Sequence, residues 1–142
     1  MSERNIELSR RLVEAFNRRE AEAWIAYCDP SIELHPLVQG GVSGNVYKGH
    51  DGIRSWQRDL EEAWGEDIRL EPEAYFDLGE YTLGFLMLRG RGGHSGVEVA
   101  MASTVVTRWR DGLAVYSKGY GRREDALSDL GVSEDELERI DP

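Results

Sequence analysis

The stretch Ile32-Glu33-Leu34-His35-Pro36 alternates apolar and polar residues and ends at a proline. Alternation with a period of two is typical of a β-strand that buries one face. The strand carries one imidazole at its end, where a small enclosed fold would place a catalytic base, because histidine titrates near neutral pH. His35 is therefore the candidate general base. The alternative is a structural histidine that is hydrogen-bonded to the backbone.

Two helices are expected before this strand. The first spans Ile6 to Arg18, where apolar residues recur every three or four positions. The second runs from about Glu20 to Cys28, because the residue before Pro30 resists helical geometry.

A glycine-rich segment, residues 39–45, follows the strand and is interpreted as a long connection, with a lid over a pocket as the alternative. Gly49-His50-Asp51-Gly52 then opens a third helix. A bulky stripe on this helix is expected to face inward. It consists of Ile53, Trp56, Leu60 and Trp64.

The remainder of the chain predicts four strands and a short helix. Asp111-Gly112 is a strong hairpin signal, Gly131 ends the helix at 123–130, and Ser133 to Glu136 forms a capping-box pattern that begins another helical turn. The expected strands are Ile68 to Leu78, Tyr81 to Arg91, Val97 to Trp109 and Leu113 to Tyr120. This order predicts an α+β fold in one domain, residues 1–142, with helices covering one face of a strongly curved antiparallel sheet.

The long strand indicates a pocket inside such a cone. One of its faces carries Val97, Val99, Met101, Ser103, Val105 and Thr107. In the next strand, parity separates Val115, Ser117 and Gly119 from Tyr116, Lys118 and Tyr120. Because Ser103, Ser117 and Gly119 are small, the space above them stays open unless large side chains fill it.

Composition limits the partners and the chemistry. The net charge of −10 disfavours nucleic acid, which requires a dominant basic surface. Cys28 is the only cysteine, so no internal disulfide forms, and no metal-ligand spacing is found around His50 or His94. We expect no metal and no cofactor. The chain has no apolar signal core and no stretch that spans a membrane, so a cytoplasmic location is expected.

Several motifs occur together in a characteristic order. They are Leu12-Val-Glu-Ala-Phe-Asn17, Asp29-Pro-Ser-Ile-Glu-Leu-His-Pro36, Val46-Tyr-Lys-Gly-His-Asp-Gly-Ile53, Gly90-Arg-Gly-Gly-His-Ser-Gly-Val-Glu98 and Trp109-Arg-Asp-Gly112. In this order the chain resembles the SnoaL-like branch of the nuclear transport factor 2-like superfamily over nearly its whole length. The resemblance implies a cone-shaped scaffold that hosts isomerases, cyclases, hydrolases, dehydratases and noncatalytic domains.

The resemblance also limits the reaction. In the related ketosteroid isomerase, an aspartate acts as the base at the place occupied here by His35. The two oxyanion donors of that enzyme fall near Leu12 and Val105, neither of which can donate a hydrogen bond. The paired aspartates around an arginine of limonene epoxide hydrolase are not recognisable either. A steroid isomerase is therefore not expected.

Three functions remain open. The first is an apolar pocket that binds a small hydrophobic molecule without turnover. The second is a cofactor-independent isomerase, cyclase or dehydratase-like enzyme that uses His35 as base, and the third is a structural dimerisation module. The residues expected to line or contact the ligand are Phe16, Tyr27, Tyr47, Trp56, Leu60, Ser103, Val105 and Ser117.

A homodimer through the outer face of the sheet is also expected. Ala100, Ala102 and Tyr116 would give that face an apolar patch among charged residues.

Overall fold

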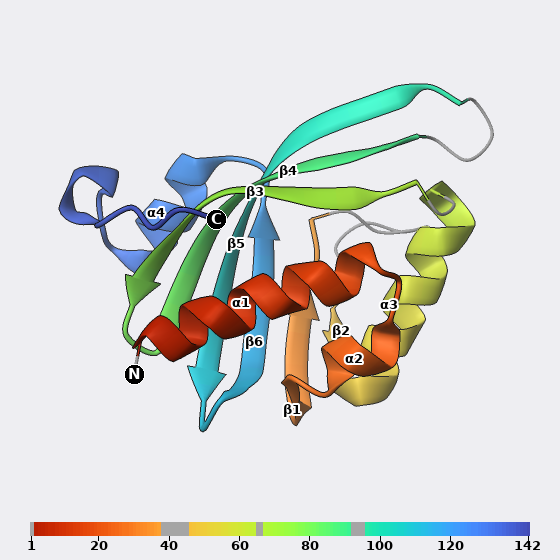
Figure 1. Cartoon of the computed structure of the whole chain (residues 1–142), viewed down its shortest axis with the longest axis horizontal. Helices are drawn as coiled ribbons and strands as arrows, with labels where there is room; N and C mark the ends of the chain where they lie inside the picture. Colours follow the sequence, from red (N-terminus) through yellow and green to blue (C-terminus); the bar gives the residue numbers. More distant parts are fainter. Residues whose placement is uncertain (1, 38–45, 65–66, 92–95) are drawn as a thin grey trace.

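The computed structural model describes residues 2–37, 46–64, 67–91 and 96–142 (Figure 1). The expected glycine-rich connection at 39–45 and His94 lie outside the described residues. The elements are α1 (Ser2–Asn17), α2 (Ala21–Ile25), β1 (Cys28–His35), β2 (Tyr47–Lys48), α3 (Gly49–Trp64), β3 (Arg69–Leu78), β4 (Tyr81–Arg91), β5 (Glu98–Arg110), β6 (Leu113–Tyr120), α4 (Arg123–Leu130) and a 3₁₀ turn (Glu134–Glu136).

The strands form one six-stranded sheet in the order β2-β1-β6-β5-β4-β3. All neighbouring strands are antiparallel except β1 and β6, which run parallel. The helices α1, α2 and α3 lie together on one side of this curved sheet (Figure 1). The α+β class and the curved sheet predicted from the sequence are confirmed.

The apolar residues form two separate cores. The larger one lies between the three N-terminal helices and the sheet, and it includes the predicted stripe residues Ile53, Trp56 and Leu60. The smaller one lies on the opposite face, where Ala126 of α4 packs near Phe85 and Val106. The prediction that helices cover only one face is therefore wrong for α4. The short C-terminal helix shields part of the outer face instead.

The second helix is shorter than predicted. It ends at Ile25, and β1 begins at Cys28, so Asp29 and Pro30 lie within a strand and not at a helix end. The pairing of β1 with β6 shifts register between Cys28 and Glu33, and proline is tolerated where the hydrogen-bonded ladder is interrupted. Asp29 supports this irregularity, because its carboxylate accepts hydrogen bonds from the Ser31 amide and hydroxyl at 2.9 and 2.6 Å.

Two more irregularities determine which side chains face inward. In β3 the pairing passes from Pro72–Leu86 to Ala74–Phe85, which leaves Glu73 as an extra residue. In β6 the pairing passes from Trp109–Ala114 to Arg108–Tyr116, which leaves Val115 unpaired. Val115 consequently borders the outer face of the sheet. The prediction that it shares a face with Ser117 is wrong.

The predicted turns are found at the expected positions. Asp111 and Gly112 both have positive φ, 54° and 78°, as the hairpin signal requires, and Gly131 ends α4 at φ 69°. The capping-box residues form the 3₁₀ turn, with the Ser133 hydroxyl donating to the Glu136 carboxylate at 2.9 Å rather than capping a backbone amide.

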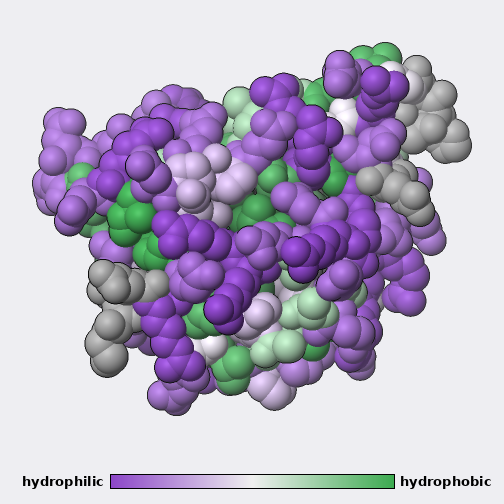
Figure 2. Space-filling model, viewed as in Figure 1, coloured by the Kyte–Doolittle hydropathy of each residue, from purple (hydrophilic) through white to green (hydrophobic). Residues whose placement is uncertain are grey.

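The surface is mainly hydrophilic. On the face drawn in Figure 2, apolar residues appear as separate patches within a polar surround. In the part of the chain that the structure describes, every helix is too short or too polar to cross a bilayer.

Candidate functional site

A cavity of about 130 Å³ lies between the three N-terminal helices and the sheet. Its helical side is formed by Leu12, Phe16, Trp24, Trp56 and Leu60. On the strand side, the main contributors are Ile32, Leu34, Tyr75, Thr82, Gly84, Leu86, Leu88, Ser103, Val105, Thr107, Ala114, Ser117 and Gly119.

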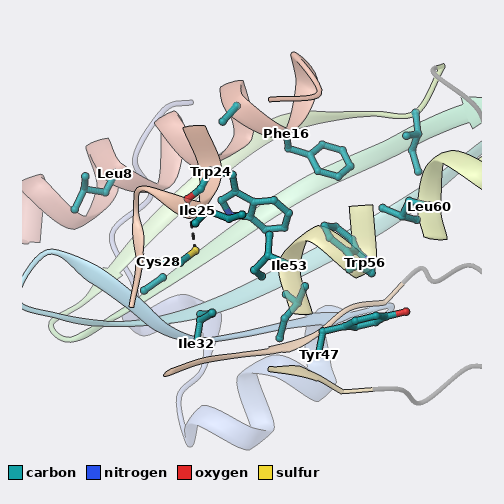
Figure 3. Packing of buried hydrophobic residues seen from close by; sticks show 14 of the residues in the cluster. Leu8, Phe16, Trp24, Ile25, Cys28, Ile32, Tyr47, Ile53, Trp56 and Leu60 are labelled. Carbon is teal, nitrogen blue, oxygen red and sulfur yellow. Dashed lines mark hydrogen bonds between the residues drawn. The ribbon is translucent and has the colours of Figure 1, made fainter. Parts of the chain in front are cut away.

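Three aromatic rings form one wall of the cavity. The ring centroids of Phe16 and Trp56 are 5.7 Å apart in a stacked arrangement, and Trp24 meets Trp56 edge-on at 5.1 Å. Figure 3 shows the three rings converging from α1, α2 and α3. Each ring is held by the other two, so this wall is rigid.

The sheet side of the cavity is open because small residues line it. Gly119 faces Leu37, whose backbone nitrogen would lie only 3.0 Å from a β-carbon at this position, so a side chain there would require Leu37 to move. Gly84 is similar, because a β-carbon there would lie 3.0 Å from the Leu86 side chain and 3.3 Å from the Tyr75 ring. With Ser103 and Ser117 nearby, these residues leave the space that the parity of β5 predicted.

Most of the predicted ligand-contacting residues line this cavity, but two do not. Tyr47 is buried, and its hydroxyl donates to the Asp59 carboxylate at 2.9 Å, directed away from the aromatic cluster (Figure 3). Tyr27 is half-buried and is not part of the lining. The residues that the structure brings together are Phe16, Trp56, Leu60, Ser103, Val105 and Ser117.

His35 faces away from the cavity. Ile32 and Leu34 line the cavity, and successive residues of a strand point to opposite faces. Glu33 and His35 therefore lie on the opposite face of β1. There the imidazole Nε2 lies 3.2 Å from the Glu33 carboxylate, and the ring packs at 5.1 Å against Tyr116. The expected pairing of Glu33 with His35 is present, but it occurs on the outer face. This placement gives no support to His35 as a base for a molecule in the cavity.

Two hydroxyls in the cavity wall are already satisfied by the protein. Ser9 donates to the Asn5 carbonyl at 2.9 Å, so Thr82 must be the donor in its 3.0 Å contact with Ser9. The oxygen of Thr82 in turn accepts the indole N–H of Trp109 at 3.0 Å. Each hydroxyl therefore donates once to a protein oxygen, and neither has a proton left for a ligand.

Tyr75 differs from these residues. Its side chain is buried and lines the cavity, but its hydroxyl has no hydrogen-bond partner among the described residues. Burial raises the pKa of Tyr75 to about 12, so the hydroxyl keeps its proton at neutral pH. Leaving a buried donor unpaired costs about 1 to 3 kcal/mol. The alternation of β3 did not predict this residue, because the bulge at Glu73 reverses the parity of the strand. Pro72 inside the strand was the available signal of this bulge, because proline interrupts the hydrogen-bonded ladder.

Cys28 also lines the cavity, and it behaves as an apolar residue. The thiol contacts the Trp24 carbonyl at 3.6 Å, and burial raises its pKa to about 12. Because the thiolate is the nucleophilic form, this cysteine is inert at neutral pH.

The lining provides little for catalysis. Among the residues that the structure describes, those around the cavity include no Asp, Glu, Lys, Arg or His. Leu12 and Val105, which the resemblance places near the two oxyanion donors of ketosteroid isomerase, both lie in the lining. Over the same described residues, no three His, Cys, Asp or Glu side chains are grouped closely enough to hold a metal ion.

Solved structures with the same fold are numerous. A protein of unknown function from Burkholderia pseudomallei, described as nuclear transport factor 2-like, is 21% identical, with 88% of this chain and 95% of that one covered and a TM-score of 0.75. TerC, co-crystallised with polyporic acid, is also 21% identical, with coverages of 89% and 97% and a TM-score of 0.74. A protein from Catenulispora acidiphila with a ketosteroid isomerase-like fold, in complex with trimethylamine, is 12% identical, with coverages of 91% and 95% and a TM-score of 0.73.

At these identities the structures establish the fold alone. No curated protein matches the sequence. The model of the SnoaL-like domain, in contrast, matches residues 9–117, which include most of α1 and nearly all of the cavity lining. By this match the chain belongs to the SnoaL-like family.

Proposed function

We propose that this protein binds a small, mainly apolar molecule in the cavity between its helices and its sheet, without converting it. The observation that carries the proposal is the cavity itself, which is lined by aromatic and aliphatic side chains with few polar groups. Binding sites for small molecules have this character.

The volume indicates the size of the ligand. An engineered cavity of about 150 Å³ with a similar apolar lining stays dry and binds benzene. The present cavity, at about 130 Å³, is suited to a molecule with a single ring. Two proteins with this fold were crystallised with organic molecules, polyporic acid and trimethylamine, which is in keeping with a fold that accepts such ligands.

Binding is favoured over turnover by the chemistry of the lining. An isomerase, cyclase or dehydratase acting on a carbonyl compound needs a base within reach of its substrate. The only titratable side chains in the described lining are Cys28 and Tyr75, and burial raises the pKa of both well above neutrality. Neither is ionised at pH 7, so neither acts as a base there.

A cavity-filling substitution tests the proposal. Val105→Phe places a larger side chain in the cavity, and we expect it to weaken the binding of toluene at least tenfold, measured by titration of backbone amide resonances. The matched control is Val115→Phe on the outer side of the sheet, which should bind toluene like the parent protein. Equal affinities in the parent and in Val105→Phe, with both folded, would place the ligand elsewhere.

A further inference from the structure

Ser103 is a buried polar side chain in the floor of the cavity, and its hydroxyl has no partner. The residue is 6% exposed and lies on β5, where it pairs with Leu86 of β4. Its hydroxyl forms no hydrogen bond to any residue that the structure describes. Buried polar groups in native proteins are nearly always hydrogen-bonded, so an unpaired one indicates a partner that is supplied from elsewhere.

The alternation of β5 directs this side chain into the cavity. Ser103, Val105 and Thr107 line the cavity, whereas Val106 belongs to the smaller core on the opposite face. Among the described residues, Tyr75 has the one unpartnered side-chain oxygen that neighbouring atoms cover fully, so the oxygen of Ser103 remains accessible. A molecule in the cavity can therefore reach the Ser103 hydroxyl.

The floor beside Ser103 has room for a ring. Val105, the next residue on this face, pairs with Gly84 of β4 on one side and with Gly119 of β6 on the other. Across these three strands, the row therefore projects a single side chain into the cavity. Ser103 follows this row by two residues, about 7 Å along the strand, so the edge of a ring that lies over Val105 is close to the hydroxyl.

The other hydroxyls of the lining already have partners within the protein. Ser9 and Thr82 both donate to protein oxygens. Thr107 and Ser117 contact each other at 3.3 Å, so one donates to the other and one proton of the pair stays free. Thr107 is about 13 Å from Ser103 along the strand, so one ligand atom cannot reach both. Ser103 differs from all four, because neither its proton nor its lone pairs are used.

From this arrangement, and resting on the proposed function above, we infer that Ser103 selects ligands that carry an uncharged oxygen acceptor, to which its hydroxyl donates a hydrogen bond. The ligand class is then a small ring compound with a carbonyl or ether oxygen at one edge. Its hydrocarbon part lies over Val105 and contacts the rings of Phe16 and Trp56.

A neutral acceptor fits this position better than an anion. The described lining contains no Lys, Arg or His, and an unpaired anion in an apolar site is strongly disfavoured. An acceptor is also what the floor lacks, because the proton of Ser103 and one proton of the Thr107–Ser117 pair have no protein oxygen to bind. The complementary ligand atom is therefore a carbonyl or ether oxygen.

A pair of ligands that differ in one atom group tests the inference. Cyclohexanone and methylenecyclohexane have nearly the same shape, but only the ketone accepts a hydrogen bond. We expect Ser103→Ala to reduce the ratio of ketone to alkene affinity about fivefold relative to the parent protein, with the alkene affinity unchanged. Comparing the ratio between proteins removes the difference in hydration of the two ligands. Both affinities are measured by titration of backbone amide resonances.

Two further variants separate the possible failures. Ser128→Ala, which removes an exposed hydroxyl on α4, should keep the parent ratio. An unchanged ratio in Ser103→Ala, with the alkene still bound, would overturn the role of Ser103 and leave the proposed cavity function standing. A larger fall in the double variant Thr107→Val/Ser117→Ala than in Ser103→Ala would also overturn it, because the pair would then be the donor. Binding of neither ligand to the parent protein would overturn both proposals.

A second measurement begins with the parent protein and needs no variant. The carbonyl stretching band of bound cyclohexanone should lie at lower wavenumber than in an alkane solvent, because a hydrogen bond weakens the C=O bond. In Ser103→Ala the band should return toward the alkane position. A band at the alkane position in the parent protein would contradict the inference.

Discussion

At the scale of single residues, the polar groups near the cavity differ in whether the protein itself supplies their hydrogen-bond partners. Ser9, Thr82 and Trp109 form a chain in which every donor has an acceptor. Tyr75 has none among the described residues. A buried group that is left without a hydrogen-bond partner lowers the stability of the folded protein.

Removing the Tyr75 hydroxyl should therefore not harm the free protein. We expect Tyr75→Phe to leave the free energy of unfolding unchanged or to raise it by up to about 1 kcal/mol, measured by urea denaturation. Tyr47→Phe is the matched control, because it removes the donor to Asp59 and should cost about 1 kcal/mol. A loss above about 1 kcal/mol in Tyr75→Phe would show that its hydroxyl has a partner.

The position of His35 on the outer face leads to a different expectation. Its contact with Glu33 is partly exposed, and exposed ion pairs contribute about 0 to 1 kcal/mol. We expect His35→Ala to cost about 1 kcal/mol or less and to leave the toluene affinity unchanged. A loss of toluene binding in this variant would show that His35 contributes to the binding site after all.

His35 and Tyr75 also show how far the site can be predicted from the sequence. The apolar residues Ile32 and Leu34 already assign the cavity face of β1, so the sequence itself places His35 outside when the alternation is applied strictly. By the same rule Ser103, Val105 and Ser117 are placed on the face where the structure has the cavity. Tyr75 was missed because the extra residue Glu73 shifts the alternation, and a bulge depends on the partner strand.

At the scale of elements, local signals predicted those boundaries that backbone chemistry determines. Gly112 and Gly131 occupy positive-φ positions. The hairpin turn at Gly112 and the end of α4 at Gly131 were both predicted correctly. The end of α2 was not, because Pro30 has two acceptable readings, a helix stop or an irregular strand, and the pairing with β6 decides between them. The side on which α4 packs depends on the apolar outer residues of β3 to β5, which local periodicity does not reveal.

The β5–β6 hairpin provides a test at this scale. Gly112 has φ 78°, where a side chain is strained, so Gly112→Ala should lower the free energy of unfolding by about 1 to 2 kcal/mol in urea denaturation. Gly121→Ala is the control, because this glycine has only an ordinary contact with Leu37 at 3.7 Å and should change stability by less than about 0.5 kcal/mol. Equal effects of the two substitutions would contradict the assignment of strain to the turn.

At the scale of the whole molecule, burial of weak acids makes stability depend on alkaline pH. Burial raises the pKa values of Cys28 and Tyr75 to about 12 from ordinary values of 9.0 and 10.0. As the pH rises, the unfolded chain loses these protons first, so their stabilising contribution is complete below about pH 9 and declines toward pH 12. The free energy of unfolding should fall by at most about 1.4 kcal/mol per pH unit for each group.

Urea denaturation between about pH 8 and pH 11 measures this decline. In Cys28→Ala the part of the decline that begins near pH 9 should disappear, while the part due to Tyr75 remains. A free energy of unfolding that stays constant over this range would show that neither group is buried in solution.

The outer face of the sheet bears on assembly. Ala100 and Ala102 are exposed on β5, and Tyr116 is half-buried on β6. We expect a homodimer through this face, observed in sedimentation as twice the 16.1 kDa monomer mass at about 50 µM, where an association free energy of roughly −7 kcal/mol gives mostly dimer. Ala102→Glu should produce monomers, and Ser128→Glu on α4 should not. A monomer in the parent protein at this concentration would contradict the expectation.

The location of a bound ligand is the central claim, and a crystal structure of the protein soaked with toluene tests it most directly. We expect electron density for the ring between the Phe16 and Trp56 side chains and the floor formed by Val105 and Ser117. Density on the outer face beside His35 and Tyr116, with the cavity empty, would contradict the claim.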